Sequence, residues 1–107
     1  MTCEEIIDRL RTLGIPSAYS HFKSPPSLPF VVYTVPNDRR YGADNRNMLK
    51  SSTVHIELYT EAKDEELENA VAELFSEYEL DGYEDYLQEE QMYMKVFEFE
   101  TVMKTGG

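Results

Sequence analysis

Apolar and polar side chains alternate from Ser52 to Tyr59, in the run Ser-Thr-Val-His-Ile-Glu-Leu-Tyr. Val54, Ile56 and Leu58 share one parity, and they alternate with Thr53, His55, Glu57 and Tyr59 on the other. A period of two in a segment rich in β-branched and aromatic residues is typical of a strand with one buried face. We therefore expect residues 50–60 to form the central strand of a sheet that carries helices on its apolar face.

The first helix is predicted over Thr2–Leu13. Thr2 and Glu5 have the spacing of a capping box, in which the threonine oxygen accepts the amide proton of the glutamate residue. Gly14 stands where a left-handed residue would close the helix, and Pro16 prevents its continuation. Apolar residues form a stripe at helical spacing, made of Ile6, Ile7, Leu10 and Leu13.

The second helix is predicted to begin after Asp64, which can cap it, with several glutamates near its positive end. Its apolar stripe predicts a helix that ends near Leu80-Asp81-Gly82. A stripe of this kind is typical of core packing rather than of a cofactor site. The stripe consists of Leu67, Ala70, Val71, Leu74, Phe75 and Tyr78.

The remaining segments predict strands and loops. A short apolar run bounded by prolines predicts a strand over residues 30–35. Two further strands, over residues 83–88 and 91–102, are predicted to form a hairpin that turns near Glu89-Glu90. The last strand carries apolar residues on both parities, so either both of its faces are partly covered or a bulge switches the buried face. Residues 17–29 are rich in proline and serine and predict a loop. Residues 37–47 collect polar, charged and glycine residues and predict a long hairpin loop between two strands.

This order of elements predicts one α+β domain over residues 1–107, in the order α-β-β-α-β-β. We expect a single sheet of about four mainly antiparallel strands, with both helices on one face.

The net charge of the chain makes some classes of binding partner unfavourable. The chain has 21 acidic and 10 basic side chains, a formal net charge of −11. Such a surface disfavours specific binding of nucleic acid and docking on anionic membranes. The only cysteine, Cys3, cannot form an internal disulfide, and the first residues lack the pattern of a signal peptide, so we expect synthesis in the cytoplasm.

Sequence motifs for catalysis, cofactors or metals do not emerge. His21 and His55 are far apart in the sequence, and His55 and Glu57 predict an ordinary exposed pair on one strand face. Nucleophile elbows and phosphate-binding glycine loops are missing from the sequence. We therefore expect a protein that is not an enzyme and that has no cofactor.

The candidate functional residues are Arg39, Arg40, Tyr41 and Arg46, in the predicted hairpin loop. They form the one cluster of basic charge on an acidic chain, and arginine and tyrosine are favoured in protein interfaces. One interpretation is that the loop contacts an acidic patch on a neighbouring copy, and the other is an exposed polar hairpin without a partner. Edge strands of the small sheet offer a second route to self-association.

The order of these segments resembles the small tail-completion, or tail-terminator, proteins of the head–tail joining region of long-tailed phages and prophages. The stretches that carry the resemblance are residues 10–16, 28–33, 54–60 with 64–67, and 89–93 with 97–100.

The resemblance implies a virion structural protein at the head–tail junction, made in the cytoplasm of a bacterial host. It implies a homo-oligomeric ring, expected to be a hexamer, that contacts tail-tube and head-connector proteins. DNA would pass through the ring without specific binding. The alternative is a monomeric acidic bacterial module or inhibitor that engages a basic protein partner.

Overall fold

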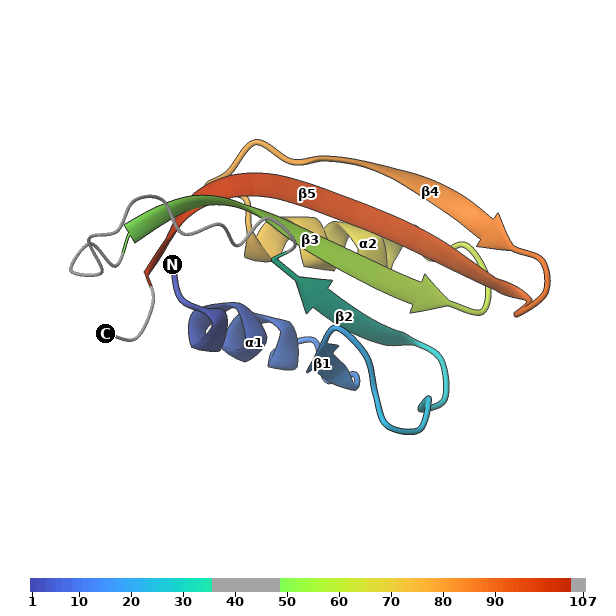
Figure 1. Ribbon diagram of the computed structural model, residues 1–107. Coiled ribbons are helices and arrows are strands. Elements are labelled where there is room, and N and C mark those ends of the chain that lie inside the picture. Colours follow the sequence, from blue (N-terminus) through green and yellow to red (C-terminus); the bar gives the residue numbers. More distant parts are fainter. Residues whose placement is uncertain (36–48, 105–107) are drawn as a thin grey trace.

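The computed structural model describes residues 1–35 and 49–104 of the chain. It has two helices and five strands in these ranges (Figure 1). The elements are α1 (Cys3–Arg11), β1 (Ser17–Tyr19), β2 (Phe30–Thr34), β3 (Leu49–Thr60), α2 (Glu65–Leu74), β4 (Asp81–Leu87) and β5 (Met92–Lys104).

The strands form one sheet in the order β1-β2-β3-β5-β4, so β3 is the central strand, as its alternation predicts. The neighbours β2–β3, β3–β5 and β5–β4 pair antiparallel, whereas β1 and β2 pair parallel. The α+β class is confirmed, but the sheet is mixed and has five strands rather than about four.

The additional strand, β1, lies in the segment predicted to be a loop. Its three residues are too few to give a periodic signal, and its pairing is tertiary. Gly14 adopts a left-handed conformation (φ 76°), as its position after the helix predicts, and the chain then turns alongside β2. The amide of Val31 donates to the carbonyl of Pro16, which fixes the parallel register.

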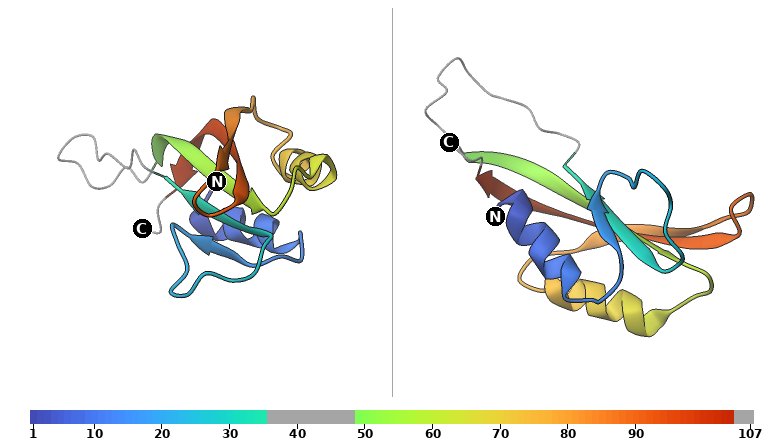
Figure 2. Two further views of the ribbon diagram at one scale, coloured as in Figure 1. Left: turned by 90° about the vertical axis from the view of Figure 1, so that its right-hand side faces the viewer. Right: turned by 90° about the horizontal axis from the view of Figure 1, so that it is seen from below.

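Both helices lie on the same face of the sheet (Figures 1 and 2). The core forms between them and the sheet, because the inward residues of β2, β3 and β5 occupy matching register positions. The fully buried side chains of this core include Ile6 and Leu10 of α1, Val71 and Phe75 of the α2 region, and Ile56 of β3.

Capping fixes the start of each helix as the sequence predicts. The side chain of Thr2 accepts from the amide of Glu5 at 3.1 Å, and that of Asp64 accepts from the amide of Leu67 at 3.0 Å. The second helix ends at Leu74, however, well before the predicted end. The ring of Phe75 stacks on Phe99 with centroids 5.0 Å apart, and a series of turns carries the chain back to the sheet edge.

Arg9 joins the two helices. Its guanidinium donates two hydrogen bonds to the carboxylate of Glu77, at 2.9 and 2.8 Å, and one to the carbonyl of Leu74. It also lies over the ring of Phe75, 5.4 Å from its centroid. The hydrogen bonds from Arg9 hold the pKa of Glu77 below its ordinary value.

The structure of β5 decides between the two alternatives that its sequence leaves open, a bulge that switches the buried face or partial burial of both faces. Its register with β3 runs without interruption from Tyr93 to Lys104, so no bulge switches its face. Phe97 and Phe99 point into the helix-facing core, whereas Val96 is fully buried on the opposite face. Both faces of β5 are therefore partly covered.

Beyond the ends of β2 and β4, the strands β3 and β5 continue as a two-stranded ribbon (Figure 1). This ribbon consists of residues 49–54 paired with residues 99–104. β2 pairs with β3 only as far as His55, and β4 pairs with β5 only as far as Glu98. The ribbon thus leaves strand edges beside the main body of the sheet.

Candidate functional site

The candidate interface residues Arg39, Arg40, Tyr41 and Arg46 lie outside the described residues, as does the whole loop predicted over residues 37–47. The site is therefore built from the surfaces that the described residues present.

The open face, which is the sheet face opposite the helices, carries a group of five carboxylates. Alternation along the strands directs polar residues to it, because the aliphatic residues of the same strands point into the core. Its carboxylates come from three adjacent strands and are Glu57, Asp81, Asp85, Glu98 and Glu100.

His55 lies between two of these carboxylates. Its Nε2 is 3.0 Å from Glu57 Oε2, and its Nδ1 is 3.5 Å from Glu98 Oε2. The other oxygen of Glu57 accepts a hydrogen bond of 2.6 Å from the hydroxyl of Tyr59. Burial, and then this hydrogen bond, raise the pKa of Tyr59 above its ordinary value. The predicted pair of His55 and Glu57 thus exists, but it is half-buried rather than exposed and belongs to a small network on the open face.

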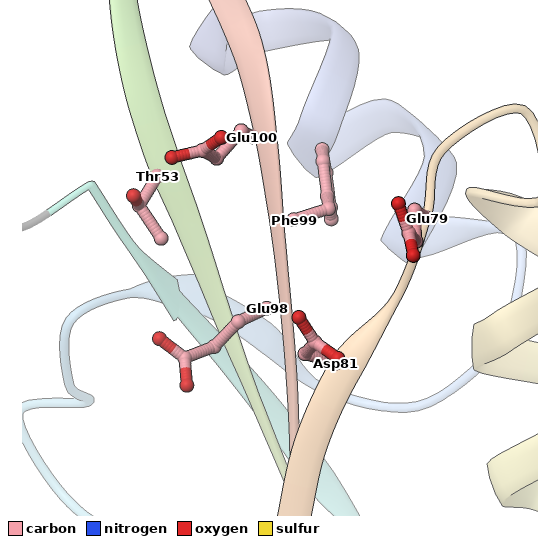
Figure 3. A pocket seen from close by; sticks show the side chains of 6 residues that line it. All are labelled: Thr53, Glu79, Asp81, Glu98, Phe99 and Glu100. Carbon is pink, nitrogen blue, oxygen red and sulfur yellow. The ribbon is translucent and has the colours of Figure 1, made fainter.

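A hollow of about 570 Å³ lies where β4 begins, at the point where β5 loses β4 as its neighbour and continues into the ribbon with β3. We call it the acidic hollow. Its lining residues are Thr53, Glu79, Asp81, Glu98, Phe99 and Glu100. Figure 3 shows that carboxylates reach it both from β5 and from the segment that enters β4. Four carboxylates around one hollow make a region of strong negative potential.

The carboxylates of the acidic hollow differ from Glu84 of β4, which has cationic partners. Lys63 donates a hydrogen bond to Glu84, and this bond holds the pKa of the carboxyl below its ordinary value. Lys95 lies 4.0 Å from the same carboxylate. Among the side chains that the structure describes, Glu79, Asp81 and Glu100 form no ion pair.

Beside the acidic hollow, the edge of β5 has no strand partner among the described residues, although the N-terminal amine binds one of its carbonyls. The carbonyl of Val96 faces β4, and backbone groups of alternate residues share a direction, so those of Glu100 and Val102 face the same way. The carbonyl of Val102 accepts from the amine of Met1 at 3.2 Å. Within residues 1–35 and 49–104, no strand pairs with β5 on this side beyond Glu98.

A second, apolar groove of about 320 Å³ crosses the other end of the open face. It lies between the segment after β1 and the turn of the β4–β5 hairpin. Phe30 stacks on Tyr59 with centroids 5.0 Å apart and meets Phe22 edge to face. The chain itself thus covers part of the open face. The groove residues are Ser20, His21, Phe22, Pro25, Phe30, Val32, Glu57, Tyr59, Leu87, Glu90 and Met92.

The acidic hollow does not have the arrangement of a metal site. In the part of the chain that the structure describes, no three acidic, histidine or cysteine side chains are placed to hold a metal ion together. Cys3 is exposed and has a free thiol. None of the described helices is long and apolar enough to span a bilayer.

Comparison of the chain with known protein families finds no match, and comparison with curated proteins finds none either.

Two of the four carboxylates of the acidic hollow, Glu98 and Glu100, could be placed from the sequence pattern. In Phe97-Glu-Phe-Glu100 the phenylalanines alternate with glutamates, so burial of the aromatic rings places both carboxylates on the open face. Glu79 and Asp81 carry no comparable signal. They reach the hollow because the second helix stops early and the chain returns to the sheet edge beside Glu98.

Proposed function

We propose that this protein is a structural subunit of the head–tail junction of a long-tailed phage or prophage. In this role it assembles into a ring, expected to be a hexamer, between the tail tube and the head connector. The order of sequence segments that resembles tail-completion proteins supports this proposal. The arrangement of charge and strand edges at the end of the sheet supports it independently.

The observation that carries the proposal is the β3–β5 ribbon, with the acidic hollow at its base. A ring requires two different, complementary surfaces on each subunit, because a head-to-tail contact repeats until the assembly closes. The hollow provides a concentrated negative surface. The chain also has a single basic cluster, at Arg39, Arg40 and Arg46, which is complementary in charge.

The net charge of −11 is compatible with this role. A ring through which DNA moves needs an inner surface that does not hold phosphate groups, and an acidic surface repels them. The ring would then contact the tail-tube and head-connector proteins through its two outer rims.

The first test is the oligomeric state of the purified chain. Size-exclusion chromatography with light scattering, and electron microscopy with tail-tube protein added, should reveal rings. A chain that remains monomeric at all concentrations and binds neither tail-tube nor connector protein would contradict the proposal.

A second test reverses the basic cluster. Arg39→Glu, Arg40→Glu and Arg46→Glu together should weaken assembly while the far-UV circular dichroism spectrum stays unchanged. A control reverses two exposed basic residues elsewhere, Arg11→Glu and Lys23→Glu, and should assemble as the parent does. Equal assembly of the two variants would show that the cluster is not the contact.

A second candidate function is a monomeric acidic module that binds a basic protein. The apolar groove favours it, because a lining of aromatic residues together with Glu57 and Glu90 suits a partner segment with both apolar and basic side chains. Isothermal titration with a DNA-binding protein from the same host separates the two functions. Tight binding by a monomer would favour this candidate over the ring.

A further inference from the structure

We propose that the apolar groove binds a short segment of another protein, in which an aliphatic or aromatic side chain stands next to an arginine or lysine. The groove lies at the end of the sheet opposite the ribbon (Figure 1). The inference deepens the second candidate function and does not rest on ring assembly, since a ring subunit can use the same groove.

The walls of the groove are in place before a partner binds. Phe30 and Tyr59 are opposite each other in the register of β2 with β3, and their rings stack with centroids 5.0 Å apart. The ring of Phe22 meets that of Phe30 edge to face at 5.5 Å, and the buried side chain of Val32 is another lining residue. A preformed apolar surface needs little ordering on binding. The volume of about 320 Å³ is small for a ligand pocket and suits one or two side chains.

Two carboxylates place negative charge beside this apolar surface. Glu57 is fixed by the hydroxyl of Tyr59, 2.6 Å from one oxygen, and by Nε2 of His55, 3.0 Å from the other. Glu90 lies in the hairpin turn, and its charge, after burial and the bond to Glu57, contributes to the raised pKa of Tyr59. None of the described residues that line the groove is a lysine or an arginine.

This combination determines the chemistry of the partner. A purely apolar segment would cover the rings but would also remove the Glu57 carboxylate from water without supplying a counterion, which is unfavourable. A purely basic segment would leave the rings in water. A segment with both kinds of side chain satisfies both requirements. Arginine suits the site best, because a guanidinium stacks on aromatic rings and donates hydrogen bonds to carboxylates.

Charge also makes a protein segment a better occupant than a single-stranded nucleic acid. Aromatic rings can stack on unpaired bases, but the phosphates would then lie beside two carboxylates, on a chain whose net charge is −11. The same charge attracts a basic segment.

The test uses the full-length chain and a set of short fluorescein-labelled peptides, with dissociation constants measured by fluorescence anisotropy. In each test peptide a leucine, phenylalanine or tyrosine stands between two arginines, in a background of glycine and serine. One control set has alanine at the central position, and another has glutamates in place of the arginines. The test peptides should bind at least about tenfold more tightly than either control set.

Variants of the protein place the bound peptide. Glu89 and Glu90 are neighbours in the hairpin turn and are both exposed, but only Glu90 lines the groove. Glu90→Lys should weaken binding of the test peptides about fivefold or more, whereas Glu89→Lys, with the same change of charge, should stay within about twofold. Phe22→Ala should weaken binding about tenfold, and Tyr19→Ala, which removes an exposed ring outside the groove, should not. Far-UV circular dichroism checks the fold of each variant.

Several results would overturn the inference. Binding that depends on the arginines but not on the central residue, or equal losses in Glu89→Lys and Glu90→Lys, would indicate attraction by net charge alone. Failure of every test peptide to bind at about 1 mM, or tighter binding of a single-stranded oligonucleotide, would exclude the proposed partner. Loss of self-association in Phe22→Ala, measured by light scattering, would make a second copy the occupant instead.

The ring and the groove are tested by separate measurements. If the parent forms rings but binds none of the peptides, only the groove contact is wrong. If the parent binds the test peptides and never associates, the groove contact stands and the ring is wrong.

Discussion

At Gly82 the backbone of β5 leaves no room for a side chain on β4, and replacement of this glycine by alanine tests the edge of the sheet. A Cβ atom at this residue would lie 1.9 Å from the carbonyl oxygen of Val96 and 2.8 Å from its carbon. These are backbone atoms of the neighbouring strand, so they cannot rotate away as a side chain can. Gly82→Ala therefore requires the first residues of β4 to move away from β5.

The expected loss of unfolding free energy follows from two contributions. The backbone of Gly82 has φ +152°, a conformation that other residues rarely adopt and that costs about 1–3 kcal/mol. Forcing extra atoms into a packed contact costs typically about 1–3 kcal/mol. Because β4 is an exposed edge strand that can partly shift, we expect a total of about 2–4 kcal/mol.

Gly14 is a matched control, since it also has a positive φ, +76°, but a Cβ atom added there would have no other atom within 4 Å. Gly14→Ala should lose only about 1–2 kcal/mol, the cost of a left-handed backbone. Equilibrium unfolding in urea, followed by far-UV circular dichroism, gives both values. If Gly82→Ala costs no more than Gly14→Ala, the close approach of β4 to β5 does not determine the need for glycine, and the reasoning is refuted.

Two further predictions concern the core. Phe75 is 1% exposed and stacks on Phe99, so Phe75→Ala should lower the unfolding free energy by about 3–5 kcal/mol. Leu74→Ala, at a partly buried position, should lower it by less than about 2 kcal/mol. Urea unfolding that gives the larger loss to Leu74→Ala would contradict the packing. Burial raises the pKa of Tyr33 to about 12 from 10.0. The unfolded chain then loses this proton first, and stability should fall as pH rises from about 10 to about 12. Tyr33→Phe should flatten this fall in unfolding curves at pH 9–12, and an unchanged slope would exclude Tyr33 as its source.

The parts of the fold that the sequence predicts are those with strong local signals. The alternation around Ile56 gives the central strand, and the capping residues Thr2 and Asp64 give the starts of both helices. The parallel strand β1 could not be predicted, because three residues contain no period and the strand forms only through pairing with β2. The early end of the second helix was missed for a similar reason: the apolar stripe continues to Tyr78, which reaches the core from a turn.

In the candidate site too, some residues have a local sequence signal and others are placed only by the tertiary structure. Glu98 and Glu100 could be assigned to the open face from the alternation of β5 alone. Their meeting with Glu79 and Asp81 depends on where the chain re-enters the sheet, and neither periodicity nor composition encodes that point.

The uninterrupted register of β3 with β5 has a consequence for the lifetime of the subunit. The same two backbone segments run from the middle of the core to the tip of the ribbon. Fraying at the tip is therefore the natural first stage of opening, and it proceeds directly into residues that hold the core together. A neighbour that clamps the tip would slow digestion by proteases throughout the sheet, so an assembled subunit should outlast a solitary one.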